Sequence, residues 1–253
     1  MTYKNLFIAF VMCVNLLLSA QEKHPHIEPQ PKEVYQFRIH YGFLNAVDAT
    51  LSRTEEVFQG QNVSHVIGTG STTGLARLFL RVDDTYESYY TNDFKPQFFK
   101  RSVVEGGYSK EEAIEFDYSL GIATAIDYTN NQTTVIKIVD HLQDLMSFYF
   151  YLKSTINPSN LTKGAIITIP ILFDSDGIHN FKITYEGTET INTTFGAQVC
   201  YKFKPFIDFG SRVFGNHKNF WVWISKDQLL PVKVKAPLVV GSITVDLESY
   251  TLH

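Results

Sequence analysis

The chain has 253 residues and a formal net charge of −4; 44% of its residues are hydrophobic and 19% are charged. This composition is typical of a globular protein with a core and excludes a disordered or collagen-like chain. Because 22 Lys and Arg residues stand against 26 Asp and Glu residues, we expect no basic surface of the kind that binds nucleic acid.

Residues 1–20 have the layout of a secretory signal peptide, with Lys4 before the apolar run Leu6–Leu18 and a small residue, Ala20, at the expected cleavage site. The run of about 13 residues is shorter than the roughly 20 that a membrane-spanning helix needs. Cys13 lies inside this run without a lipoprotein cleavage site around it. We therefore predict a periplasmic protein, or alternatively an extracellular one, with no transmembrane segment after cleavage.

Residues 21–32 contain three prolines and no apolar periodicity, which predicts an extended N-terminal tail. No linker divides the chain after this tail, so residues 33–253 are predicted to form a single domain. After cleavage Cys200 is the one remaining cysteine. The stability of the domain must then come from its core, because no internal disulfide can form.

The mature chain alternates between apolar and polar residues with the period of a β-strand. Tyr35, Phe37, Ile39 and Tyr41 show this pattern first, and it returns in residues 180–185, 199–204 and 243–248. One-sided alternation indicates antiparallel sheets with one face in water. Turn residues separate the strands at short intervals, so we predict a mainly β fold: a large, strongly curved antiparallel meander, either a half-barrel or a partly closed barrel or sandwich.

One segment has a helical period instead. Apolar residues recur with helical spacing between Asp140 and Lys153, which predicts one amphipathic helix near residues 140–154 with Asp140 as its N-cap. A single helix beside a curved sheet is expected to close one end or to cover the open face. A second, shorter helix is predicted around Leu75–Leu80.

The chain contains 20 Phe, 14 Tyr and 2 Trp residues, more rings than a thin sheet needs. The segment Phe220–Ile224 is apolar on both faces, which predicts a strand that is buried on two sides or lines an apolar cavity. A filled sandwich core and a hollow half-barrel that holds a ligand both stay open. The candidate cavity-lining residues are Tyr35, Phe37, Ile39, Tyr41, Trp221 and Trp223.

The sequence contains no catalytic or cofactor-binding motif with the residue spacing that such a motif requires. The run Gly68–Gly74 fits neither a dinucleotide-binding nor a Walker loop, and is interpreted as a flexible strand end. No metal-ligand spacing is found among the histidines, no cofactor is expected, and Cys200 is interpreted as a bystander. A hydrolytic site would have to be assembled across strands from two of four carboxylates, namely Asp83, Glu87, Glu105 and Asp144.

Short motifs in a fixed order resemble the family of exported bacterial proteins known as domain of unknown function 3108. They include Glu33-Val34-Tyr35, Arg81-Val82-Asp83-Asp84, Glu105-Gly106, Gln143-Asp144-Leu145-Met146-Ser147, Thr194-Phe195-Gly196, Trp223-Ile224-Ser225, Pro231-Val232 and Gly241-Ser242-Ile243. The resemblance runs over nearly all of the mature chain. Lys32, where a Gly is usual, and Lys153, where an Arg is common, depart from the pattern. The resemblance implies a mostly antiparallel β fold in the envelope of gram-negative bacteria and carries over no catalytic residue.

The sequence therefore favours a non-catalytic envelope protein that binds an apolar or amphipathic molecule, with a lipid as the expected kind of partner. Two alternatives remain. The first is an interaction module that pairs an exposed strand with another protein, and the second is the hydrolase with cross-strand carboxylates.

Overall fold

The computed structural model describes residues 32–42, 44–157, 160–207, 220–237 and 241–253. The chain divides into two units, Met1–Gln30 and Pro31–His253. The predicted signal peptide and the predicted tail up to residue 31 lie outside the described residues, all of which belong to the second unit. Within this described part, no helix is long and apolar enough to cross a membrane.

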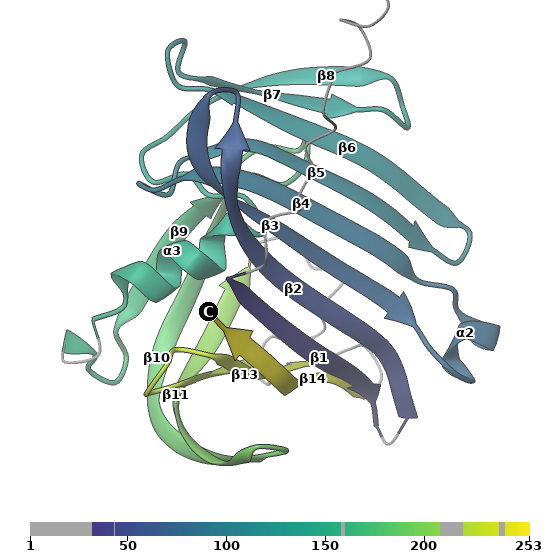
Figure 1. Cartoon of the computed structure of the whole chain (residues 1–253), viewed down its shortest axis with the longest axis vertical. Coiled ribbons are helices and arrows are strands. Elements are labelled where there is room, and N and C mark those ends of the chain that lie inside the picture. Colours follow the sequence, from purple (N-terminus) through teal and green to yellow (C-terminus); the bar gives the residue numbers. More distant parts are fainter. Residues whose placement is uncertain (1–31, 43, 158–159, 208–219, 238–240) are drawn as a thin grey trace, which may run out of the picture. The chain divides into compact units, whose positions relative to one another are not determined.

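The described residues form one antiparallel sheet of fourteen strands (Figure 1). The strands are β1 (Glu33–Tyr41), β2 (Leu44–Phe58), β3 (Gln61–Thr72), β4 (Asp83–Thr91), β5 (Pro96–Glu105), β6 (Tyr108–Asp117), β7 (Ile122–Asp127), β8 (Gln132–Lys137), β9 (Ile166–Ile171), β10 (His179–Thr193), β11 (Gly196–Ile207), β12 (Trp221–Ser225), β13 (Pro231–Pro237) and β14 (Ser242–Leu252). This confirms the predicted mainly β, antiparallel fold.

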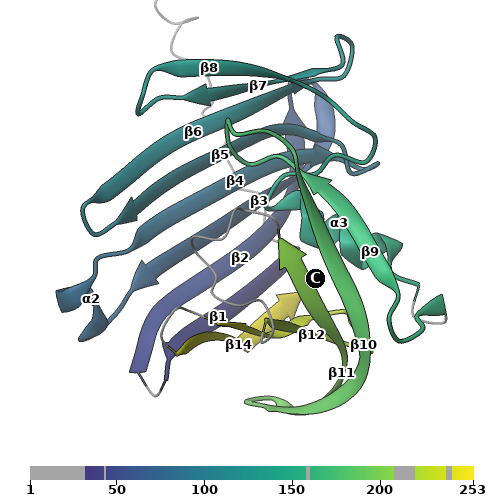
Figure 2. The same ribbon diagram turned by 180° about the vertical axis from the view of Figure 1, so that it is seen from behind.

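Strands that are neighbours in the sheet are consecutive in the chain, with one exception at the centre of the sheet. The strand order is β8-β7-β6-β5-β4-β3-β2-β1-β14-β13-β12-β11-β10-β9, so the first strand pairs with the last. The sheet is an open one, with β8 and β9 as its edges. Two arms result, β1–β8 and β9–β14, and Figure 2 shows the second arm folded in front of the first.

Two short helices accompany the sheet. Helix α2 (Ala76–Phe79) lies between β3 and β4, as the sequence predicts. Helix α3 (Ser147–Thr155) lies between β8 and β9 in the chain and packs against both arms. Its side chains Tyr149 and Phe150 join the core around Tyr35, whereas Leu152 joins the core of β9–β12. The helix therefore fills part of the space between the arms.

The predicted start of this helix at Asp140 is wrong. Residues before Ser147 are not helical, because the Gln143 N–H donates to Pro170 O and its carbonyl accepts from the Leu172 N–H, each over 2.9 Å. The residue that caps the helix is Asp144, whose Oδ1 accepts from the N–H groups of Met146 (2.7 Å) and Ser147 (2.8 Å). This satisfies donors that the first helical turn leaves free.

Candidate functional site

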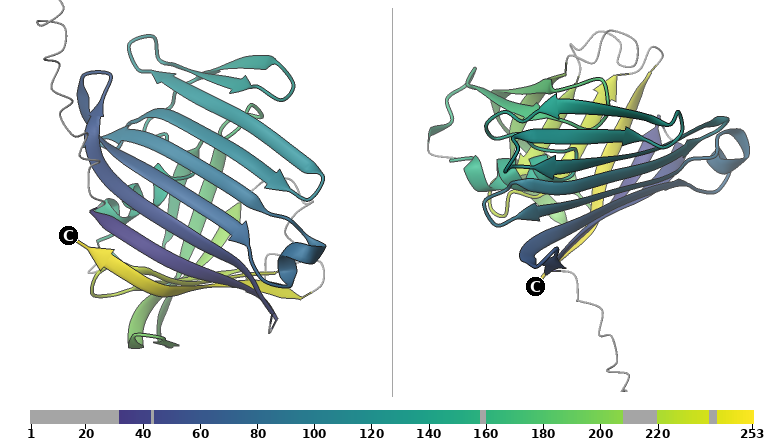
Figure 3. Two further views of the ribbon diagram at one scale, coloured as in Figure 1. Left: turned by 45° about the vertical axis from the view of Figure 1, so that its right-hand side comes forward. Right: turned by 90° about the horizontal axis from the view of Figure 1, so that it is seen from above.

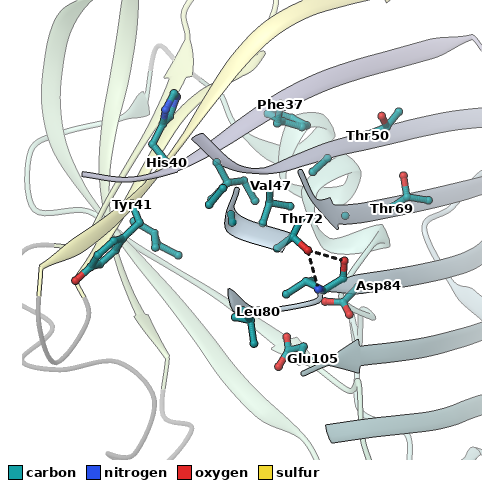
Figure 4. Close-up of a pocket in the computed structure, with 18 of the residues that line it drawn as sticks. Phe37, His40, Tyr41, Val47, Thr50, Thr69, Thr72, Leu80, Asp84 and Glu105 are labelled. Atoms are coloured by element: carbon teal, nitrogen blue, oxygen red, sulfur yellow. Dashed lines mark hydrogen bonds between the residues drawn. The ribbon is translucent and has the colours of Figure 1, made fainter. Parts of the chain in front are cut away.

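The candidate functional site is an apolar cavity of about 770 Å³ at one end of the first arm (Figure 4). Its wall comes mainly from the inward faces of β1, β2 and β3, with α2 and Met146 completing it. The apolar lining residues include Phe37, Ile39, Tyr41, Leu44, Val47, Ala49, Leu51, Phe79, Leu80, Val82, Met146 and Ile243. A cavity of this size and character is typical of sites that bind small molecules.

Two glycines of β3 leave room for this cavity. Gly68 and Gly70 line it from within β3, which ends at Thr72, inside the run Gly68–Gly74 that is interpreted from the sequence as a strand end. A Cβ atom at Gly68 would lie 2.9 Å from Met146 Sδ, closer than such atoms approach. The absence of a side chain at this position lets Met146 reach the strand.

A second cavity of about 250 Å³ adjoins the first and shares part of its wall. Phe37, Ala49 and Leu51 line both cavities. The rest of its lining is apolar and comes from α3 and from the second arm, including Phe148, Leu152, Phe181, Ile183, Phe203, Val222, Ile224, Val234 and Val245. The interior between the arms is thus partly filled by α3 and partly hollow.

The polar residues that line the larger cavity include His40, Thr50, Thr69, Thr72, Asp84, Tyr86 and Glu105, and three of them gather near one end of it. Asp84 and Glu105 lie there together with Thr72 (Figure 4). Asp84 Oδ1 accepts from the N–H of Val104 over 3.1 Å. Burial raises the pKa of Asp84, and the neighbouring Glu105 carboxylate raises it further. Burial also raises the pKa of Tyr86, another lining residue, to about 12, so its hydroxyl stays protonated at neutral pH.

The β1 residues chosen from the sequence divide between cavity and core. Phe37, Ile39 and Tyr41 line the larger cavity. Tyr35 is fully buried instead, with its ring 6.0 Å from that of Tyr149 in an edge-to-face arrangement. Its hydroxyl donates to Glu33, which also accepts from Lys153 Nζ at 2.8 Å. Tyr35 therefore holds α3 against β1.

The tryptophans of β12 do not line either of the two cavities. Val222 and Ile224 do so, and strand alternation places Trp221 and Trp223 on the other face. There Trp223 Nε1 donates to Glu189 Oε2 over 3.1 Å, and Lys202 Nζ lies 4.5 Å from the Trp221 ring centroid. Both faces of β12 are thus buried, as the sequence predicts: Trp223 belongs to the core around Tyr35 and Ile224 to the core of β9–β12.

The four carboxylates of the hydrolase hypothesis have different surroundings. Asp83 forms ion pairs with Arg77 and Arg81, which hold its pKa at about 2. Glu87 is 2.7 Å from His65 Nε2. Asp144 is buried and accepts from Ser88 Oγ over 2.6 Å. Among the four, only Glu105 lines the larger cavity, and its neighbour there, Asp84, does not belong to the predicted set.

The described residues show neither a reactive thiol nor a metal-binding group. Cys200 is buried, and burial raises the pKa of its thiol to about 11, which disfavours the reactive thiolate. No group of three or more His, Cys, Asp or Glu in the described part of the chain could hold a metal ion.

The sequence did not indicate the cavity residues outside β1. Four of them are small or flexible residues, namely Ala49, Gly68, Gly70 and Met146. The register of β2 and β3 places the first three at the cavity, and the path of the chain before α3 places Met146 there. Thr50 and Thr69 pair directly across β2 and β3, and both line the cavity. Register of this kind has no local signal in the sequence.

The chain matches several solved structures, among them the following three. A beta-barrel-like protein of domain of unknown function DUF1849 from Brucella abortus superposes with a TM-score of 0.56 at 6% identity, covering 89% of this chain and 99% of its own. A Bacteroides fragilis protein with a YmcC-like fold has a TM-score of 0.35 at 9% identity, with 88% and 97% covered. A Parabacteroides distasonis protein has 0.33 at 10% identity, with 88% and 96% covered. Only the first similarity is high enough to support the fold.

The search among curated proteins found no match. The model of a family described as "Protein of unknown function (DUF3108)" matches residues 36–248. This range runs from β1 to β14 and includes both cavities. The chain therefore belongs to the DUF3108 family.

Proposed function

We propose that this protein is an exported, non-catalytic protein of the cell envelope that binds an apolar or amphipathic molecule in the cavity lined mainly by β1, β2 and β3. The apolar cavity of about 770 Å³ carries this proposal. Burial of apolar ligand surface against such a wall is favourable by about 25 cal/mol per Å². The signal-peptide pattern of residues 1–20 supports export, with the periplasm as the expected compartment and the extracellular space as the alternative.

In this proposal Phe37, Ile39 and Tyr41 contact the ligand directly, and Ala49 and Gly70 provide the space that it occupies. The polar head of an amphipathic ligand lies at the end where Asp84 and Glu105 gather. A carboxylate that is cut off from water needs a polar partner there, because burying it without one costs free energy. Tyr35 acts indirectly by fixing α3, and Trp221 and Trp223 support β12 from its other face.

The experiment is native mass spectrometry of the protein isolated from the periplasm under mild conditions. We expect a mass above that of the mature chain, released as a lipid or another apolar molecule on denaturation. Ala49→Trp places a large ring in the wall shared by both cavities and is expected to remove the added mass. Val135→Trp, at an exposed position of β8, is the matched control and keeps it.

The proposal is wrong if the native protein carries no added mass and if no added lipid raises its melting temperature. Circular dichroism of Ala49→Trp separates ligand loss from unfolding. A smaller substitution at the same wall, Ala49→Leu, serves where the tryptophan variant does not fold.

A second candidate function, the protein–protein interaction module, has one observation in its favour. Edge strand β8 has neighbours on one side only among the described strands, and its Val135 side chain is exposed. Such an edge can accept an added strand from a partner. Crosslinking from position 135 in cells would test it, and recovery of no repeated partner would count against it.

A further inference from the structure

Four large apolar side chains project into solvent around α2, at the connection between β3 and β4. Leu75, Leu78, Phe79 and Leu80 are 67%, 78%, 88% and 51% exposed. We call these four residues the lip. A single exposed leucine is ordinary, but four within six residues form a local apolar surface that favours an interaction.

The lip is continuous with the cavity. Phe79 and Leu80 line the cavity and are exposed at the same time. Tyr41 and Leu44, next to the β1–β2 turn, also line it and are also exposed. The views in Figure 3 show α2 and the β1–β2 turn at the same end of the strands. A path of apolar side chains therefore leads from the cavity to solvent at this end.

Charges around the lip nearly balance. Arg77 and Arg81 share the carboxylate of Asp83, with Arg77 bound to it through both terminal nitrogens. Asp84 and Glu105 lie at the adjacent end of the cavity. With two cations beside three carboxylates, this end has no strong electrostatic attraction for a polyanion. Binding at the lip must come mainly from apolar contact.

We propose that the lip inserts into the interfacial layer of a lipid bilayer and that the cavity exchanges its ligand with the membrane there. This inference rests on the proposed function, because it names the surface from which an apolar ligand would enter. Passage along the lip would let such a molecule move between bilayer and cavity without exposing its apolar surface to water.

The shape of the lip favours a membrane over a protein partner. A helix of four residues offers no row of anchors at i, i+3, i+4 and i+7, which a hydrophobic groove in a protein would recognise. A small apolar tip can instead be buried among lipid chains. Gly106, in the turn between β5 and β6, lies next to Leu80, since a Cβ atom there would be 3.1 Å from Leu80 Cδ1, and Tyr108, two residues further along, is exposed. Tyrosine is enriched where membrane proteins meet the headgroup layer.

The test is co-sedimentation of the full mature protein with phosphatidylethanolamine and phosphatidylglycerol vesicles, and with phosphatidylcholine vesicles. We expect binding to both, with little dependence on salt. The double variant Leu75→Ser with Leu78→Ser changes lip residues that do not line the cavity, and should lower the partition coefficient at least about tenfold. Leu120→Ser, in the turn at the other end of β6 and 69% exposed, is the matched control and should bind as the wild type does.

A second measurement separates this inference from the proposed function. A pyrene-labelled fatty acid, supplied as monomer in solution, should bind the double variant as well as it binds the wild type. Absence of wild-type vesicle binding would overturn the lip proposal, as would equal loss in Leu120→Ser or capture of a protein through the lip without vesicle binding. Vesicle binding without fatty-acid binding would support the lip and count against the ligand-binding function.

Discussion

At the scale of single residues, the side chains with the largest structural role are those whose surroundings the sequence does not reveal. Gly68 and Met146 are an example, since the missing Cβ of one makes room for the thioether of the other. Asp144 is another: its residue type suits a hydrolytic carboxylate, yet it is the buried cap of α3. A local sequence pattern identifies a residue type that suits such a role, but it does not identify the residue of a distant segment that contacts it.

The burial of Asp144 predicts an acid-dependent gain in stability. Burial raises its pKa from the ordinary value near 3.8 to about 6, against the opposing effect of its hydrogen bond with Ser88 and the bonds from the helix. A raised carboxyl pKa means that the folded state binds the proton more tightly than the unfolded state does. The contribution is therefore complete below about pH 3.8 and is lost as the pH rises through about 6.

Urea unfolding between pH 7 and pH 5 measures this effect. Over this range wild-type stability should contain a component of about 1 kcal/mol that rises on acidification. Asp144→Asn, which keeps an acceptor oxygen, should remove that component. Asp117→Asn is the control, because Asp117 is an exposed turn carboxylate whose bonds from Ser119 and Leu120 lower its pKa. A pH profile in Asp144→Asn equal to that of the wild type would contradict the assignment.

At the scale of elements, strands were more predictable than the helix. Alternation in β1, β10, β11 and β14 identifies each strand, because successive side chains of a strand point to opposite faces. It does not always identify the buried face, since in β11 Val199 is 52% exposed and Cys200 is buried. Leu142 and Leu145 share the helical spacing of the apolar residues in α3, and for this reason the sequence predicts a helix that begins at Asp140. The pairing of Gln143 with the end of β9 overrides it, and that contact joins segments far apart in the sequence.

The packing of α3 between the arms predicts a large cost for truncating its buried side. Leu152 is buried against the core of β9–β12. Leu152→Ala should lower the free energy of unfolding by about 2 to 5 kcal/mol, since it removes apolar contacts and leaves a cavity. Ser154→Ala, on the exposed side of the same helix, is expected to cost less than about 1 kcal/mol. Chemical denaturation followed by circular dichroism measures both, and equal losses would contradict this packing.

At the scale of the whole described unit, the sequence predicts a curved antiparallel meander but not the seam at its centre. Turns between alternating strands predict that each strand pairs with the next one along the chain, and every neighbouring pair of the sheet except β1–β14 is of this kind. The pairing of β1 with β14 joins the two ends of the domain and has no local signature. The position of the second arm, and with it the division between filled and hollow space, depends on that pairing.

Deletion of residues 242–253 tests the importance of this seam. It removes β14, including buried Leu247, and leaves β1 and β13 with unpaired edges in the middle of the sheet. We expect loss of cooperative thermal unfolding and aggregation. Removal of His253 alone, which donates its N–H to Lys32 O over 2.8 Å, is the control and should keep a cooperative transition. A soluble, cooperatively unfolding protein without β14 would show that each arm is stable by itself.

The pairing of the first strand with the last also sets the order of events when the chain is made. Strands β1 to β8 can form hairpins one after another as they emerge, but one edge of β1 has no partner until β14 has been synthesised. Until then Phe37, whose cross-strand neighbour on that edge is Leu247, belongs to an unfinished sheet. Contacts between such distant segments form slowly, so the nascent chain carries an exposed strand edge for nearly the whole time of its synthesis. A holding chaperone that shields this edge would determine how much of the protein reaches the folded state.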